Sequence, residues 1–248
     1  MVTKNRLPAC TTAWIWRNII KFAGATPPGR SCRKSVMKKP RFTPLQILVH
    51  IAGWLPLALL LFDFFNDNLT ANPIQAIEQR TGLNAITFLL LSLGCTPIAS
   101  LSGWKELTQR RKALGNYAFL YAALHVSTFF ILDYGLDLAA VWRDVGTKSF
   151  IIIGALAFLM LLPLAVTSFN YWMKRLGKNW KRLHRLVYII SPLVVIHFFM
   201  AKKGDLLSLS GDIVQPLAYG AVAILLLLLR VAPIKKPLIA LRQRIFAR

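Results

Sequence analysis

The segment GKNWKRLHRLVYIISPLVVIHFF, from Gly177 to Phe199, decides how the rest of the chain is interpreted. It opens with a basic stretch and continues as a long apolar run, yet it contains His184 and His197, thirteen residues apart (197 − 184). A run of about 18 or more apolar residues is long enough to cross a bilayer. An ionisable side chain inside such a run is costly unless it faces the interior of a helix bundle, so this segment predicts a membrane helix with a functional site.

The composition of the whole chain supports an integral membrane protein. It has 248 residues, 56% of them hydrophobic, and a mean hydropathy of +0.52, against about 45 to 50% apolar residues in soluble domains. The apolar runs are continuous and rich in leucine, without the alternation of barrel strands, so they predict short helices. Six spans are expected, at residues 45–65, 84–101, 115–134, 150–167, 183–200 and 214–231. The predicted fold is an all-α bundle of six transmembrane helices.

The charge distribution predicts the orientation of the bundle. A net charge of +22 is compatible with nucleic-acid binding, but the cations concentrate in the loops after the second and fourth spans and in the tail. The opposite loops carry both signs. By the positive-inside rule, both termini are cytoplasmic.

Three regions are expected: a basic arm over residues 1–41, the helix bundle over 42–232 and a basic tail over 233–248. The first acidic residue of the chain is Asp63. Three interpretations of the arm are open: an organelle transit peptide, a surface helix around AWIWRNIIKF, or a disordered cytoplasmic arm that touches anionic lipid. A secretory signal is not expected. Cys10, Cys32 and Cys95 have no metal-type spacing and do not suggest a disulfide framework.

All four histidines fall inside a predicted span or at its mouth: His50, His125, His184 and His197. At about 1.5 Å per residue, His125 lies roughly 15 Å into its span. His184 lies at the cytoplasmic mouth, and His197 lies roughly 20 Å deeper. His50 lies at a depth similar to that of His184. The histidines therefore mark two levels in the membrane.

Two levels of imidazole in a small bundle are typical of b-type haem. Zinc is an alternative, but it needs about four clustered ligands. A proton relay favours buried carboxylates, and only Asp63 and Asp133 approach that role, near span ends. Packing or solvated histidines remain a further alternative. On an ideal helix His184 and His197 lie roughly 140° apart, and Pro192 between them is expected to kink the helix.

Several motifs resemble one known family. They are TGLNAITFLLLSLGCTPIA (81–99), LGNYAFLYAALHV (114–126), LGKNWKRLHRLVYIISPLVVIHF (176–198) and HIAGWLPL, which begins at His50. Together they are similar to the MsrQ (YedZ) family, the haem-binding membrane subunits of bacterial periplasmic methionine sulfoxide reductase systems. This family belongs to the ferric-reductase-like transmembrane superfamily. The resemblance extends from about residue 45 to 231.

The resemblance implies an electron conduit in the bacterial inner membrane. Members carry haem b, one or two per chain, and are described as binding FMN. They take electrons from a cytoplasmic flavin reductase or quinone and pass them to the periplasmic molybdopterin reductase MsrP. The family's haem ligands fall on His125, His184 and His197. Related proteins have two histidines on each ligand helix, so the fourth axial position is unassigned here, and His50 is a candidate for it.

The resemblance does not place the flavin on particular residues. Lys178, Trp180 and Arg182 are candidates to meet a flavin phosphate or haem propionates, with ordinary positive-inside charge as the alternative. The basic arm is also longer than the family pattern leads us to expect.

Two other functions compete with the electron conduit. A self-contained ferric or oxygen reductase needs a nicotinamide- and flavin-binding domain, and the chain has no G-x-G-x-x-G and only a short tail after Val231. A transporter or structural membrane protein with packing histidines is the other alternative. Without a redox cysteine pair or a recognisable molybdopterin domain, the chain is expected to be an electron-transfer subunit, with methionine sulfoxide reduced by its partner.

Overall fold

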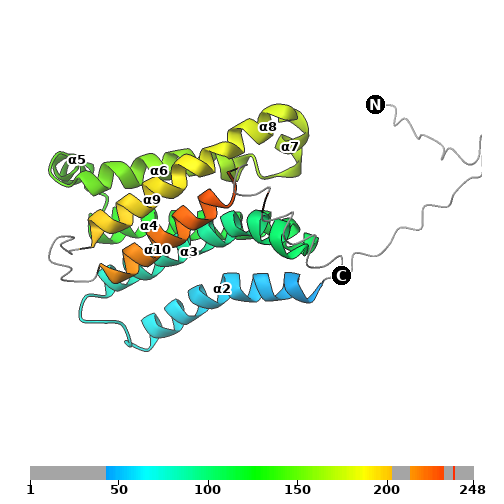
Figure 1. The fold of residues 1–248 in the computed structure, drawn as a ribbon. Helices are drawn as coiled ribbons and strands as arrows, with labels where there is room; N and C mark the ends of the chain where they lie inside the picture. The colour runs from blue at the N-terminus through cyan, green and yellow to red at the C-terminus, as the bar shows by residue number, and fades with distance from the viewer. Residues whose placement is uncertain (1–42, 203–212, 232–236, 238–248) are drawn as a thin grey trace, which may run out of the picture. The chain divides into compact units, whose positions relative to one another are not determined.

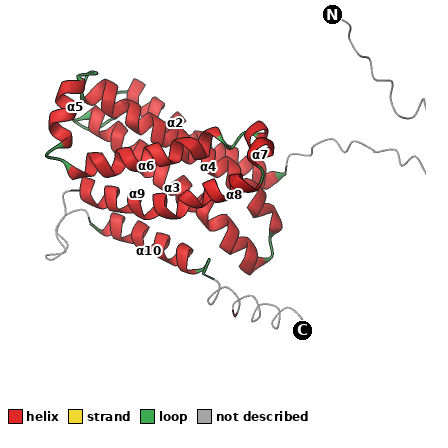
Figure 2. Cartoon of the chain, turned by 90° about the horizontal axis from the view of Figure 1, so that it is seen from above, coloured by secondary structure: helices red, strands yellow, loops and turns green. Residues whose placement is uncertain are grey.

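A computed structural model describes residues 43–202, 213–231 and 237. The predictions about the basic arm and most of the tail therefore lie outside the described residues. Six long helices make up most of the described part, as Figures 1 and 2 show. They are α2 (Pro44–Phe65), α3 (Pro73–Ser102), α4 (Lys105–Thr128), α6 (Ser149–Val166), α9 (Val187–Ala201) and α10 (Val214–Leu228). Helix α3 packs along α4, and α9 lies between α6 and α10.

Shorter elements connect these helices. A π-helical turn, η1 (Phe129–Asp133), extends α4, and α5 (Leu138–Val145) leads into α6. Helices α7 (Asn170–Leu176) and α8 (Lys178–Leu183) and the 3₁₀ turn η2 (His184–Leu186) lead into α9. We call the end of the bundle near α5 the α5 end. The end near α7 and α8 is the basic end (Figure 1).

The all-helical prediction is confirmed for the described residues. Five helical segments are long and apolar enough to cross a membrane: Pro44–Phe65, Pro73–Ser102, Lys105–Asp133, Ser149–Val166 and Lys178–Ala201. Helix α10 is apolar but has only 15 residues, so the count of six spans stays a prediction, as does the location of the termini.

The expectation that all helices are short is wrong for α3. This helix has 30 residues and begins at Pro73, eleven residues before the predicted span (84 − 73). The Asn72 side chain caps it by accepting a hydrogen bond from the backbone N–H of Gln75, at 3.2 Å. Proline is favoured at this first position because no intrahelical partner is lost. The first turns are polar, so hydropathy alone does not reveal them.

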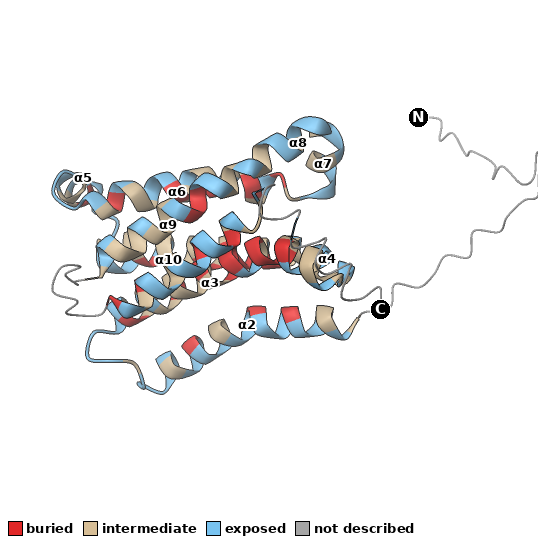
Figure 3. Cartoon of the chain, viewed as in Figure 1, coloured by how far each residue is buried: buried red, intermediate tan, exposed pale blue. Residues whose placement is uncertain are grey.

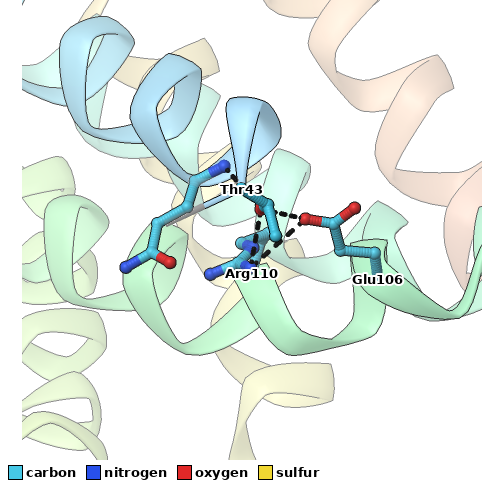
Figure 4. Close-up of polar contacts among 4 residues, drawn as sticks. Thr43, Glu106 and Arg110 are labelled. Carbon is cyan, nitrogen blue, oxygen red and sulfur yellow. Dashed lines mark hydrogen bonds and ion pairs between the residues drawn. The ribbon is translucent and has the colours of Figure 1, made fainter. Parts of the chain in front are cut away.

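A polar contact ties the start of α2 to α4 at the basic end (Figure 4). The Thr43 hydroxyl caps α2 by accepting from the N–H of Gln46 and donates to the Glu106 carboxylate. Arg110 Nη2 donates to Thr43 Oγ1 at 3.0 Å and to Glu106 Oε1 at 3.2 Å. One hydroxyl therefore both starts α2 and fixes where it meets α4.

At the α5 end, a second polar group holds α5. The Asp137 carboxylate caps the helix by accepting from the N–H groups of Ala139 and Ala140. The Asp144 carboxylate accepts from Lys148 Nζ and from the Tyr134 hydroxyl, each at 2.5 Å. The Lys148 hydrogen bond, followed by that of Tyr134, holds the pKa of Asp144 below its usual range.

The middle of the bundle is aromatic, and Figure 3 shows many of its buried residues on α3. The fully buried Tyr121 stacks on Phe88 with ring centroids 5.4 Å apart. Its hydroxyl donates to the Gly53 carbonyl at 2.7 Å and accepts from the Leu57 N–H at 3.0 Å. This hydroxyl sits between two groups that normally bond each other in a helix, next to Pro56. Tyr121 thereby fixes α2 to α4.

We expect Gly53→Ala to destabilise the protein by about 1 to 3 kcal/mol, the usual cost of overpacking. A Cβ at this position lies only 2.3 Å from Cζ of the Tyr117 ring, so the ring or α2 must move. Thermal unfolding in detergent measures the change. Gly146→Ala is the matched control, since its nearest contact is an ordinary 3.5 Å to the Arg143 carbonyl. Equal melting temperatures for the two variants contradict the prediction.

Candidate functional site

His125 on α4 and His197 on α9 meet inside the bundle toward the α5 end. Their ring centroids are 6.1 Å apart and their planes lie at 77°. His125 Nδ1 lies 3.0 Å from the Glu78 carbonyl on α3, and His197 Nδ1 lies 2.8 Å from the Phe150 carbonyl on α6. Four helices therefore orient this pair of rings.

These hydrogen bonds define which nitrogen each ring offers. A carbonyl only accepts, so Nδ1 carries the proton and Nε2 has the lone pair. Metal-binding histidines commonly hold their second nitrogen in this way. Two imidazoles on one iron, with bonds of about 2 Å as in other histidine sites, have ring centroids roughly 6 Å apart. His125 and His197 are therefore the two residues that would hold a haem iron between them.

Two glycines that were not predicted as site residues leave the space that these rings occupy. A Cβ on Gly154 of α6 lies 2.7 Å from Cε1 and Nδ1 of His197. A Cβ on Gly82 of α3 lies 3.2 Å from His125 Nδ1. Glycine inside a helix costs stability relative to alanine, so a glycine within an apolar run was the available signal of a close approach.

His184 lies at the other level, in a cavity of about 490 Å³ at the basic end. Its Nδ1 lies 3.1 Å from the Trp180 carbonyl. Its ring lies against the Trp180 indole, with centroids 4.1 Å apart. The indole N–H in turn donates to the Thr167 carbonyl at 2.9 Å. The Leu164 backbone is a second hydrogen-bond partner of this imidazole.

This cavity, which we call the basic cavity, combines an apolar wall with positive charge. Leu89, Leu93, Phe119, Leu161 and Leu164 line the apolar part. Five cations from separate parts of the chain share the lining: Arg111, Lys112, Lys181, Arg185 and Arg230. Among the described residues, no Asp or Glu lines it. The basic cavity is therefore suited to a ligand that combines an apolar part with negatively charged groups.

The three residues that the sequence suggested for contact with an anionic cofactor coincide only in part with the lining of the basic cavity. Trp180 belongs to it, whereas Lys178 and Arg182 are not among the described residues that line it. Arg111 and Arg230 were not predicted, because they come from the start of α4 and the turn after α10. Folding alone brings these segments together.

His50 on α2 has a different partner. Its ring is exposed, and its Nδ1 lies 2.9 Å from the Tyr117 hydroxyl. It is not among the described residues that line the basic cavity, so its pairing with His184 stays a prediction. Within the described ranges, no group of three or more His, Cys, Asp or Glu side chains is arranged to hold a metal ion, which gives no support to a zinc cluster.

Comparison with known proteins places the chain in a family. Residues 52–195 match the model of the ferric reductase like transmembrane component. A protein of Herminiimonas arsenicoxydans, named protein-methionine-sulfoxide reductase heme-binding subunit MsrQ, is 40% identical over 193 residues, covering 77% of this chain and 86% of the relative. Relatives of the same name from Bordetella pertussis and Xanthomonas euvesicatoria are 40% and 39% identical, covering 75% and 73% of this chain and 87% and 82% of the relatives.

These matches cover most of this chain and most of each relative, and the family model agrees with the apolar helices of the structure. The chain is thus a multi-pass bacterial membrane protein. It belongs to the MsrQ family of ferric-reductase-like membrane proteins.

Proposed function

We propose that this protein binds b-type haem between His125 and His197 and carries electrons across the bacterial inner membrane to a methionine sulfoxide reductase. The observation that carries this proposal is the pair of rings 6.1 Å apart, each held through Nδ1 by a carbonyl of another helix. Its relatives are named heme-binding subunits of such a reductase. The orientation adopted has the basic end in the cytoplasm.

The chemistry assigns different steps to this protein and to the reductase. Bound haem supplies a one-electron couple whose potential depends on its axial ligands and its burial. Reduction of a sulfoxide to a thioether consumes two electrons and two protons and releases water, so two successive electron transfers serve each methionine. In this proposal His125 and His197 hold the iron, and a periplasmic molybdopterin enzyme of the MsrP type reduces the methionine sulfoxide.

The basic cavity around His184 is the proposed entry point for electrons. Its volume of about 490 Å³ lies in the range of cofactor pockets, roughly 300 to 1,000 Å³. Its five cations favour a ligand with phosphate or carboxylate groups, such as FMN or a second haem, over a neutral quinone. A cytoplasmic flavin reductase is accordingly the favoured donor. Which of the two cofactors occupies the cavity is decided by counting haem and flavin per chain.

An absorption spectrum of the purified protein tests the proposed function. After expression with ample haem, we expect a Soret band that shifts on reduction with dithionite. The reduced protein should be reoxidised by a purified MsrP-type reductase only when methionine sulfoxide is present. Absence of the shifting band removes the cytochrome function. A normal band without reoxidation removes the proposed partner while leaving haem binding intact.

A further inference from the structure

Arg230, in the turn after α10, holds this last helix to two others. Its Nη1 donates to the Tyr188 hydroxyl at 2.7 Å, and its guanidinium carbon lies 5.2 Å from the centre of the Tyr188 ring. Its Nη2 donates to the Leu93 carbonyl on α3. One guanidinium therefore joins α10, α9 and α3.

The Leu93 carbonyl needs this donor because of the sequence of α3. In an α-helix, a carbonyl accepts from the N–H four residues later. For Leu93 that residue is Pro97, which has no N–H. The carbonyl would otherwise lack its intrahelical bond inside the protein, and Arg230 replaces the missing donor.

The third nitrogen of the Arg230 guanidinium, Nε, has no hydrogen-bond partner among the described residues. This nitrogen is buried. Arg230 also lines the basic cavity, which contains four further cations and no acidic side chain from the described residues. A buried, unpaired donor of a charged group is costly, and clustered like charges repel one another. An anion in the cavity relieves the repulsion among these cations.

We propose that Arg230 binds the anionic group of the cofactor in the basic cavity and thereby couples its binding to the docking of α10. The anionic group is a phosphate or a carboxylate, and the inference rests on the proposed cofactor role of this cavity. Arginine suits the task because its planar fork presents several donors in fixed directions. With Nη1 and Nη2 held by Tyr188 and Leu93, the guanidinium is oriented before the ligand arrives. Lysine has no such fork.

Charged and neutral forms of the same ligand isolate this interaction. Purified full-length protein, depleted of its basic-cavity cofactor, is titrated with FMN and riboflavin in one arm and with haem and haem dimethyl ester in the other. Preference for FMN indicates a flavin phosphate, and preference for free haem indicates propionates. We expect wild-type protein to bind the charged form of one pair about tenfold more tightly or better. We expect Arg230→Gln to lose most of that preference.

The coupling to α10 is read from thermal unfolding. The charged ligand should raise the melting temperature of wild-type protein and raise that of Arg230→Gln by much less. The matched control is Arg143→Gln, an exposed arginine at the α5 end, which should behave as wild type. Should Arg230→Gln fail to fold, Arg230→Lys decides, since it keeps the charge but not the fork and should show a reduced preference.

Two results overturn the proposal in different ways. If wild-type protein binds charged and neutral forms equally in both arms, the anionic cofactor of the basic cavity is wrong, and Arg230 has no such role. If wild-type protein prefers a charged form and the Arg230 variants keep the full preference and stabilisation, the cavity stands and Arg230 is not its ligand. The Soret band of the His125 and His197 haem is recorded separately, so neither result is confused with loss of that haem.

Discussion

Replacing His197 with alanine is expected to leave the protein without the haem at the α5 end, and His125→Ala should do the same. Each substitution removes one of the two imidazoles whose centroids lie 6.1 Å apart, and with it one of the two proposed ligands of the haem iron. Altering only an outer partner of a metal ligand typically costs 10- to 100-fold in affinity. Loss of the ligand itself should therefore lower bound haem by about tenfold or more. Haem per chain and the redox titration measure the effect.

Two control variants elsewhere in the chain make this prediction specific. Ser127→Ala is the matched control, because Ser127 is exposed on the same helix two residues from His125, and it should retain wild-type haem content. His184→Ala should alter the cofactor of the basic cavity and leave the α5-end haem in place. If His125→Ala and His197→Ala both retain the haem content and reduction potentials of wild-type protein, the assignment of the ligands is wrong.

The sequence alone predicted the helices well where apolar length is the signal. The predicted span 45–65 differs from α2 by one residue at its start, and the predicted span 150–167 differs from α6 by one residue at each end. The same signal failed at the polar start of α3, where Asn72 and Pro73 begin the helix. The kink at Pro192 stays a prediction, since α9 continues through this residue, and the structure adds a 3₁₀ turn that begins at His184 itself.

The site was less predictable than the fold. Histidine in an apolar run is conspicuous, so all four candidates were visible, but the sequence does not show which rings face each other. The partners that orient them are backbone carbonyls of Glu78 and Phe150, and any residue type supplies a carbonyl. Arg230 was hidden for a similar reason, since its role depends on a carbonyl that Pro97 leaves without a donor, on a different helix.

Gly154→Ala is expected to displace the His197 ring and to weaken haem binding by about tenfold or more, on the scale seen when the orienting partner of a ligand is lost. The new Cβ lies 2.7 Å from both Cε1 and Nδ1 of that ring. The ring has little freedom to move away, because its Nδ1 is bonded to the Phe150 carbonyl one turn earlier on α6. Any shift that relieves the contact therefore changes the direction of Nε2.

A graded series of glycine variants separates this effect from a general loss of helix packing. Gly82→Ala places a Cβ 3.2 Å from His125 Nδ1, a gap that a shift of a few tenths of an ångström relieves, so its haem affinity should fall less than that of Gly154→Ala. Gly146→Ala, with only an ordinary contact, should match wild type.

The three variants are compared by haem titration and by the melting temperature of the haem-free protein. Haem affinity should decrease from the Gly146 variant to the Gly82 variant and then to the Gly154 variant. The melting temperatures of the haem-free proteins need not follow this order. If haem affinity falls only in proportion to the melting temperature of the haem-free protein, the glycines act only through helix packing. The role assigned to Gly154 in positioning the His197 ring is then wrong.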